Sequence, residues 1–119
     1  MRIPKPILDR RRALRIRESL PFQIGHKDYE CQAVSINISS SGIYCLVDRN
    51  IPVMTQLDLC LFLPSVEKKR AKKIELRGVV VRREKQAATG KFFIAIYFSR
   101  AKPVDREFLE KYILQRLKK

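Results

Sequence analysis

The sequence predicts a mainly β protein, a six-stranded antiparallel β-barrel followed by a C-terminal α-helix. Between residues 20 and 98, apolar side chains recur at every second position in six short runs, the period of a strand with one buried face. Beyond residue 101 the period becomes helical, with Leu109, Ile113 and Leu117 spaced four residues apart. At 119 residues, the chain fits a single domain.

The N-terminal segment, residues 1–18, is predicted to be a basic arm ahead of the barrel. Pro4 and Pro6 argue against a helix at its start, and the arginine-rich stretch that follows has no clean apolar stripe. The segment does not resemble a signal peptide. The longest apolar runs of the chain fall far short of the roughly 20 residues that a membrane span needs. A cytoplasmic protein without a membrane span is therefore expected.

The barrel is predicted within residues 19–100 and the helix within residues 101–119. Gly78 lies inside the fifth run, where it suggests a bend or bulge. Pro103 suits the first helical position, and acidic residues follow it at the positive end of the helix dipole. The predicted strands cover residues 20–25, 29–37, 42–47, 56–64, 73–84 and 91–98.

The net charge is +14, and the isoelectric point is about 10.2, which indicates an anionic partner. Charge alone does not choose among a nucleic acid, a nucleotide and an acidic membrane or protein surface. The three cysteines, Cys31, Cys45 and Cys60, lie in apolar runs without CxxC spacing, and His26 is the single histidine. No nucleophile motif such as GxSxG occurs. Neither an enzyme, nor a metal site, nor a cofactor is expected.

Two polar clusters stand out against the strands. The first is the arginine run at residues 10–17, "RRRALRIR", which on its own is typical of a solvated charge run. Arg11 and Arg15 are four residues apart, and a guanidinium is a planar fork of donors that matches a phosphate or the O6/N7 edge of guanine. A mobile arm with several arginines could wrap a nucleotide from more than one side.

The second cluster is "NISSSG", residues 37–42, between two apolar runs. On its own it is typical of a polar turn in which Gly42 supplies a positive φ. The functional interpretation is that Asn37 and Ser39 aim their side-chain oxygens outward at a ligand, while Gly42 lets the ligand approach the backbone.

Together, the two clusters resemble the signature of the PilZ domain family, RxxxR followed after twenty-odd residues by [D/N]xSxxG. The first motif is Arg11 to Arg15 and the second is Asn37 to Gly42, with every defining position matched. The family has a six-stranded β-barrel and usually a C-terminal helix, and the predicted order of elements agrees with it. The resemblance implies a receptor for cyclic di-GMP, a bacterial second messenger.

The resemblance also implies a role for each motif residue. Arg11 and Arg15 would grip phosphate oxygens and guanine edges and stack on the bases. Asn37 would accept hydrogen bonds from guanine N1 or N2, less strongly than the aspartate that is commoner there in the family. Ser39 would supply a hydroxyl group, and Gly42 would leave room for the base.

Arg10 directly precedes RxxxR, and in the family an arginine there tends to accompany two stacked ligand molecules rather than one. The resulting hypothesis is a switch: ligand clamps the mobile arm onto the barrel and alters the surface that an unidentified effector protein contacts.

Two alternatives remain at this point. One is a small barrel that binds nucleic acid without sequence preference, with Tyr44, Arg82 and Tyr97 as candidate contacts. Ordinary sheet surface is the preferred interpretation of those three residues. The other alternative is a PilZ adaptor that does not bind ligand, against which the intact motifs argue.

Overall fold

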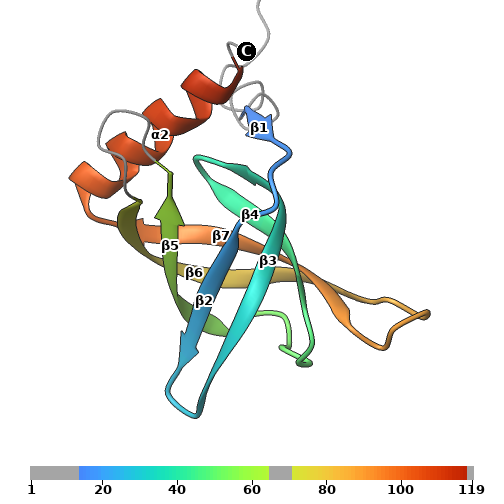
Figure 1. The fold of residues 1–119 in the computed structure, drawn as a ribbon. Helices are drawn as coiled ribbons and strands as arrows, with labels where there is room; N and C mark the ends of the chain where they lie inside the picture. The colour runs from blue at the N-terminus through green and yellow to red at the C-terminus, as the bar shows by residue number, and fades with distance from the viewer. Residues whose placement is uncertain (1–13, 65–70, 118–119) are drawn as a thin grey trace, which may run out of the picture.

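The computed structural model describes residues 14–64 and 71–117. It contains one antiparallel sheet and a C-terminal helix, α2 (Pro103–Leu117) (Figure 1). The strands are β1 (Arg15–Ile16), β2 (Pro21–His26), β3 (Tyr29–Ser39), β4 (Gly42–Val47), β5 (Gln56–Leu63), β6 (Lys72–Lys85) and β7 (Phe92–Ala101).

The sheet closes into a six-stranded barrel. Around the barrel the strands follow the order β2-β5-β6-β7-β4-β3, and β3 pairs with both β2 and β4, so no edge is left between them. The short strand β1 pairs with the far end of β3, beyond the part that pairs with β2. The predicted fold class is confirmed. Arg15 and Ile16 were predicted as part of the arm. In the structure they form β1, which pairs with β3.

The barrel interior is filled by the alternating side chains of its strands. On β5, the four leucines at 57, 59, 61 and 63 are all 2% exposed or less. On β7, Ile94, Ile96 and Phe98 are equally buried, as the period of two predicts. The interior is therefore a packed apolar core, and most polar residues of the strands face outward; Ser35 and Ser39 of β3 are buried.

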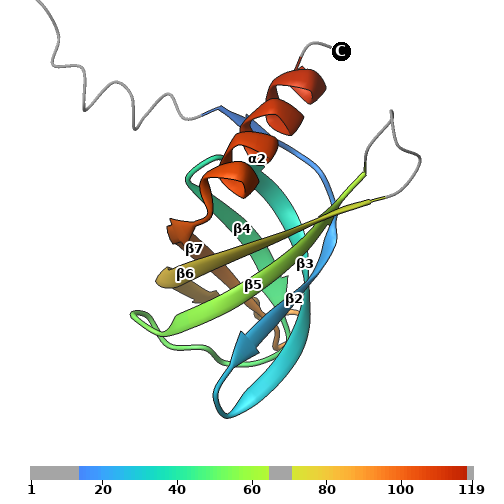
Figure 2. The ribbon, with the colours of Figure 1, turned by 90° about the vertical axis from the view of Figure 1, so that its left-hand side faces the viewer.

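Helix α2 lies across one end of the barrel (Figures 1 and 2). Leu109, Tyr112 and Ile113 are buried against the core, whereas Leu117, which shares their predicted stripe, is 42% exposed. Near the start of the helix, the carboxylate of Asp105 accepts a hydrogen bond from the Glu75 backbone N–H of β6 at 3.2 Å. No helix in the described part of the chain is long and apolar enough to cross a membrane.

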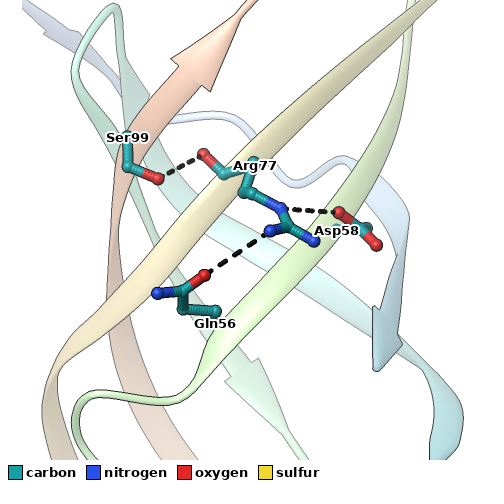
Figure 3. Close-up of polar contacts among 4 residues, drawn as sticks. All are labelled: Gln56, Asp58, Arg77 and Ser99. Atoms are coloured by element: carbon teal, nitrogen blue, oxygen red, sulfur yellow. Dashed lines mark hydrogen bonds and ion pairs between the residues drawn. The ribbon is translucent and has the colours of Figure 1, made fainter. Parts of the chain in front are cut away.

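Three β-bulges interrupt the regular pairing of the barrel. One lies beside Gly78, where the sequence suggests a bend: Arg77 pairs with Arg100 and Gly78 with Phe98, so that Ser99 is the extra residue. The hydroxyl of Ser99 donates to the backbone carbonyl of Arg77 (Figure 3). The other two bulges lie in β3 and β6, and both position polar side chains, as described below.

Candidate functional site

The base of the arm is held by a buried serine of β3. The hydroxyl of Ser35 accepts a hydrogen bond from the Leu20 N–H at 2.8 Å and donates to the carbonyl of Glu18. The Ser35 N–H also donates to the Leu20 carbonyl at 3.0 Å. These bonds satisfy the backbone groups where the chain leaves β1 and enters β2. Consequently, the segment from Arg15 to Leu20 follows the edge of β3.

The bulge in β3 turns Asn37 toward the outside of the barrel. Ser35 pairs with Cys45 and Asn37 with Tyr44, so Ile36 is an extra residue in β3. Before the bulge, Ser35 faces the interior, and strict alternation would send Asn37 inward as well. The extra residue reverses this alternation, so Ile38 is buried and Asn37 is only partly buried. The bulge therefore exposes the polar side chain.

Arg15 and Asn37 contact each other directly. The Arg15 Nη1 atom donates a hydrogen bond to Asn37 Oδ1 at 2.9 Å, and the Arg15 side chain is exposed. The two residues meet because Arg15 on β1 pairs with Ser39 of β3, two residues from Asn37 on the same strand. The structure thus brings one residue of each predicted motif together.

Ser39 does not point outward, and that prediction is wrong. The side chain is fully buried, and its hydroxyl accepts hydrogen bonds from the N–H groups of Ser41 and Gly42 at 3.1 and 3.2 Å. Ser and Thr hydroxyls make such local bonds where they stabilise a turn. In this structure Ser39 fixes the conformation of the β3–β4 turn and presents no oxygen at the surface.

Gly42 is required by the packing of two strands. Its φ is not positive: among the described residues, the only glycine with a positive φ is Gly90. A Cβ atom at position 42 would lie 2.6 Å from the carbonyl oxygen of Ile96 on β7. The expected positive φ is therefore wrong, and a close approach of β4 to β7 takes its place as the reason for glycine.

The bulge in β6 exposes Arg82 in the same manner. Val80 pairs with Ile96 and Arg82 with Ala95, so Val81 is the extra residue. Val80 is buried, and strict alternation would direct Arg82 inward. Because of the bulge, Arg82 instead faces outward, as its partner Ala95 does. Arg82 is exposed.

A single outward-facing row therefore crosses four strands. Asn37 on β3 pairs with Tyr44 on β4, Tyr44 with Ala95 on β7, and Ala95 with Arg82 on β6. At both ends of this row, a bulge has turned the polar residue outward. The adjoining row contains Gly42 paired with Tyr97, which is 52% exposed. Each row thus combines a small residue, Ala95 or Gly42, with an aromatic one, Tyr44 or Tyr97.

These rows form the floor of a cleft of about 480 Å³. Two arginines, Arg15 and Arg82, line the cleft, and none of its lining residues in the described part of the chain is a carboxylate. The ring of Tyr44 stacks on Phe93 with centroids 5.7 Å apart, which fixes its orientation. A cleft with two guanidinium groups, an amide and two tyrosine rings can bind a planar anion through ion pairs, hydrogen bonds and stacking.

A second hollow of about 510 Å³ lies over β2, β5, β6 and β7. It has three carboxylates in its lining, those of Glu30, Asp58 and Glu75, beside three basic residues. Its Arg77 is already paired, with Nε 3.2 Å from Asp58 Oδ1 and a longer contact to Gln56 (Figure 3). The mixed charges make this hollow a poor site for an anion, so the cleft is the better candidate.

Helix α2 contacts both the β3–β4 turn and the segment between β1 and β2. The Arg106 Nη1 atom donates to the carbonyl of Ser40, in the β3–β4 turn, at 3.3 Å. The Tyr112 hydroxyl donates to Glu18 Oε2 at 2.5 Å, and Arg116 Nε lies 3.4 Å from Glu18 Oε1. Burial, assisted by this bond to Glu18, raises the pKa of Tyr112 to about 12.

The placement of the predicted site residues is thus uneven. Arg15, Asn37 and Gly42 line the cleft. Ser39 is buried and does not line the cleft, and Arg10 and Arg11 lie outside the described residues.

Tyr44, Arg82 and Tyr97 line the same cleft, although ordinary sheet surface was the preferred interpretation of them. The alternation of the strands predicts an outward Tyr44 and Tyr97. Arg82 was also predicted on the sheet surface, but strict alternation from Val80 does not account for its position, because a bulge leaves no clear mark in a valine-rich run.

The fold and the cleft define a class of protein: a small closed barrel with a cleft lined by two arginines and a helix across one end. A family model described as "PilZ domain" matches residues 9–115. The chain belongs to the PilZ domain family.

Solved structures with the same fold agree with this assignment. Inhibitor of motility (MotI/DgrA) from Bacillus subtilis is 25% identical, with a TM-score of 0.78; the match covers 89% of this chain and 50% of that one. The PilZ domain of YcgR from Escherichia coli, solved with c-di-GMP, is 13% identical, with a TM-score of 0.65 and 92% of each chain covered.

A third similar structure is the Borreliella burgdorferi PlzA protein in complex with c-di-GMP, 11% identical, with a TM-score of 0.59; the match covers 96% of this chain and 55% of that one. This chain spans about half the length of MotI/DgrA. A search of curated protein sequences gives no match.

Proposed function

We propose that this protein is a receptor for cyclic di-GMP that acts as an adaptor toward an effector protein. The observation that supports this most strongly is the contact between Arg15 and Asn37 at a cleft whose described lining residues include two arginines and no carboxylate. The two PilZ structures solved with c-di-GMP have the same fold, which is consistent with the proposal.

Ligand entry would exchange one hydrogen bond for several. The Asn37 amide oxygen accepts a hydrogen bond from Arg15. A guanine that offers its N1–H and N2–H groups to Asn37 would replace that donor. The released guanidinium of Arg15 would then bind a phosphate or the O6/N7 edge of guanine. The contact thus keeps both side chains in place until the ligand arrives.

The opposite side of the cleft supplies further contacts in this proposal. Arg82 ends the row that begins at Asn37, three strand spacings of about 4.8 Å away, or about 14 Å along the curved sheet. This span suits a ligand with two phosphates and two guanines better than one nucleotide. The rings of Tyr44 and Tyr97 would stack on guanine faces. Gly42, required by packing, also leaves the floor of the cleft open.

The arm would close over the ligand through Arg10 and Arg11. Fixing one residue costs about 1–2 kcal/mol, so fixing residues 10–14 costs on the order of 5–10 kcal/mol. A micromolar complex has about −8 kcal/mol in total. The pairing of Arg15 and Ile16 with β3 lowers this cost, because part of the arm is in place before ligand binds.

Amide hydrogen exchange would test the closure. The Arg15–Ile16 segment should already be protected without ligand, since it pairs with β3. Cyclic di-GMP should add protection at residues 10–13. If ligand binds and leaves exchange at residues 10–13 unchanged, the closure is wrong.

Isothermal titration with cyclic di-GMP tests the proposed function itself. The wild-type protein should bind with low-micromolar affinity or better, and with two ligand molecules per chain. Arg15→Ala should abolish binding. Arg100→Ala is the matched control, because it removes an exposed arginine that lines the other hollow. A wild-type protein that gives no heat would overturn the proposal.

A nucleic-acid-binding barrel remains the second candidate, since Tyr44, Arg82 and Tyr97 share one cleft. The salt dependence of the binding affinity distinguishes this candidate from a cyclic di-GMP receptor. Binding to a long polyanion falls by about 10³ or more between 50 and 200 mM salt. A ligand with two phosphates should lose far less affinity over the same range.

A further inference from the structure

One side of the barrel carries charged residues in a fixed order across the sheet. Glu30 on β3 pairs with Gly25 on β2, Gly25 with Asp58 on β5, Asp58 with Arg77 on β6, and Arg77 with Arg100 on β7. These five residues, here called the charged row, all line the second hollow, on the side of β2, β5 and β6 that Figure 2 shows. Carboxylates therefore occupy one half of the row, and guanidinium groups occupy the other half.

The hollow is balanced in charge, although the whole chain has a net charge of +14. Its lining contains three carboxylates and three basic side chains, which are those of Glu30, Asp58, Glu75, Arg77, Arg100 and Lys102. The net positive charge of the chain opposes the approach of a second copy. At this hollow, however, a second copy would meet carboxylates as well as basic groups.

The central pair of the row remains accessible to a partner. Arg77 Nε lies 3.2 Å from Asp58 Oδ1, yet 46% of the Arg77 side chain and 68% of the Asp58 side chain are exposed (Figure 3). An ion pair this exposed contributes little to folding. A guanidinium donates about five hydrogen bonds and a carboxylate accepts about four, so both groups retain capacity for further contacts.

An apolar side chain lies beside the charged row. Residues alternate along β5 between the interior and the surface, so Asp58, Cys60 and Phe62 share its outward face. Phe62 is 47% exposed, and Cys60 also lines the hollow. Aromatic side chains are enriched at the centres of protein interfaces. This side of the barrel thus combines balanced charges with an exposed aromatic ring.

We propose that the charged row is the interface of a homodimer whose two-fold axis runs parallel to β5 and β6, between these two strands. Such an axis keeps the position of a residue along the strands and reverses the order of residues across them. Asp58 of one copy then faces the partner's Arg77, and Arg77 faces the partner's Asp58. This inference is independent of the proposed function. The cleft stays open in the dimer, because the cleft and the hollow share no lining residue.

A second copy fits this surface because the charged row is complementary to its own rotated image. A two-fold interface brings the same patch of both copies together, so the patch must be self-complementary. A row with carboxylates at one end and guanidinium groups at the other meets this requirement. A nucleic acid or an anionic membrane would instead meet the carboxylates of Glu30 and Asp58.

The curvature of the closed barrel limits the contact to residues near the axis and to long side chains beyond it. The partner's Gly25 would lie opposite Arg100 and has no side chain, so Arg100 has room to reach the partner's Glu30. The two Phe62 rings would lie at the same height along β5, about 4.8 Å apart across the axis at one strand spacing, where they pack together.

Sedimentation velocity of the full-length protein with reversed charges tests this geometry. The wild-type protein should be dimeric at about 100 μM, well above a micromolar dissociation constant. Asp58→Lys and Arg77→Glu should each weaken the dimer more than tenfold, because each places like charges on both sides of the axis. An equimolar mixture of the two variants should form a heterodimer, since both pairs across the axis are again opposite in charge.

Arg83→Glu is the matched control for these variants. It makes the same change on the same strand, but Arg83 is exposed outside the lining of the hollow and should leave the dimer unchanged. Melting temperatures close to that of the wild-type protein would show that all three variants are folded.

Cross-linking gives a second measure of the same contact. A short bis-maleimide should join Cys60 to the partner's Cys60, because both would lie beside the axis. Cys31→Ser should retain the covalent dimer, and Cys60→Ser should abolish it. Phe62→Ala should weaken the dimer about tenfold, whereas Tyr97→Ala, which removes a ring of similar exposure from the cleft, should leave it unchanged.

The outcomes separate this interface from others and from the receptor function. A wild-type protein that stays monomeric at about 100 μM overturns the proposal. A wild-type dimer that persists in both single variants, or whose variants stay monomeric when mixed, also overturns it, because the copies then associate through another surface or in another orientation. Titration with cyclic di-GMP is measured separately, so failure of the receptor function leaves the dimer standing, and failure of the dimer leaves the receptor function standing.

Discussion

The guanidinium of Arg15 donates a hydrogen bond to the amide oxygen of Asn37 at 2.9 Å, although 22 residues separate them in sequence. The contact joins the two polar motifs. It depends on two features of the backbone, the pairing of β1 with the end of β3 and the bulge at Ile36 that turns Asn37 outward. The site is therefore partly assembled by the fold itself.

Asn37→Asp should tighten cyclic di-GMP binding. A carboxylate accepts hydrogen bonds from guanine more strongly than an amide, and the gain of about 1 kcal/mol corresponds to roughly fivefold in affinity. Calorimetric titration measures it. Asn50→Asp is a suitable control, since Asn50 is exposed and accepts from Arg83 Nη1 outside the cleft lining. Weaker binding by Asn37→Asp would contradict the role assigned to this acceptor.

Ser39→Ala should destabilise the protein by about 1–3 kcal/mol, because the N–H groups of Ser41 and Gly42 lose their buried acceptor. Urea denaturation without ligand measures this loss. Ser40→Ala provides the comparison, since it is the backbone carbonyl of Ser40 that binds Arg106. A Ser39→Ala protein of wild-type stability with reduced ligand affinity would instead favour a direct ligand contact.

Gly42→Ala should cost about 1–3 kcal/mol of folding free energy, because the added methyl group would overlap the Ile96 carbonyl at 2.6 Å. At Gly25, the nearest atom to an added Cβ is 3.7 Å away, an ordinary contact. Gly25→Ala should therefore be tolerated better. Thermal melts of the two variants test whether Gly42 is required by the packing of β4 against β7. Equal melting temperatures would contradict this role.

The contact between Tyr112 and Glu18 should make stability depend on alkaline pH. The pKa of Tyr112 is raised in the folded protein from 10.0 to about 12, chiefly by burial. A raised pKa favours the protonated side chain in the folded state, so its contribution is complete below about pH 10 and is lost as pH rises toward 12.

Urea denaturation between pH 8 and pH 11 compares the wild-type protein with Tyr112→Phe. At pH 8 the variant should be less stable, because Glu18 loses a hydrogen bond of about 1–2 kcal/mol. The difference should narrow as pH rises. A constant difference across this range would show that the phenol does not titrate as expected.

The sequence predicts the barrel well because burial of one face imposes a period of two that single residues rarely obscure. The leucines of β5 and the isoleucines of β7 follow it without exception. Bulges are different, because one inserted residue changes which face every later side chain takes and carries no distinctive composition. This is why the sequence does not reveal that Arg82 shares one outward-facing row with Asn37 and Tyr44, although it predicts Arg82 on the sheet surface.

Prediction from the sequence has a similar limit for individual residues of the candidate site. The motif spacing predicts that Arg15 and Asn37 belong to one site, and the structure brings them into contact. The motif spacing does not predict that Ser39 faces inward, because the hydroxyl of a serine in a turn can bond either to the backbone or to a ligand. Leu117 is a comparable case, since helical period alone does not reveal that the barrel end is covered before the last turn of α2.

Titration of Arg82→Ala with cyclic di-GMP, beside wild type and Arg15→Ala, tests the central claim most directly. The claim is that one ligand site spans the row from Asn37 to Arg82. Binding by the wild-type protein should be abolished in Arg15→Ala and at least tenfold weaker in Arg82→Ala. Wild-type binding that Arg82→Ala leaves unchanged would contradict a ligand spread across this cleft, and a wild-type protein that gives no heat would contradict the receptor function.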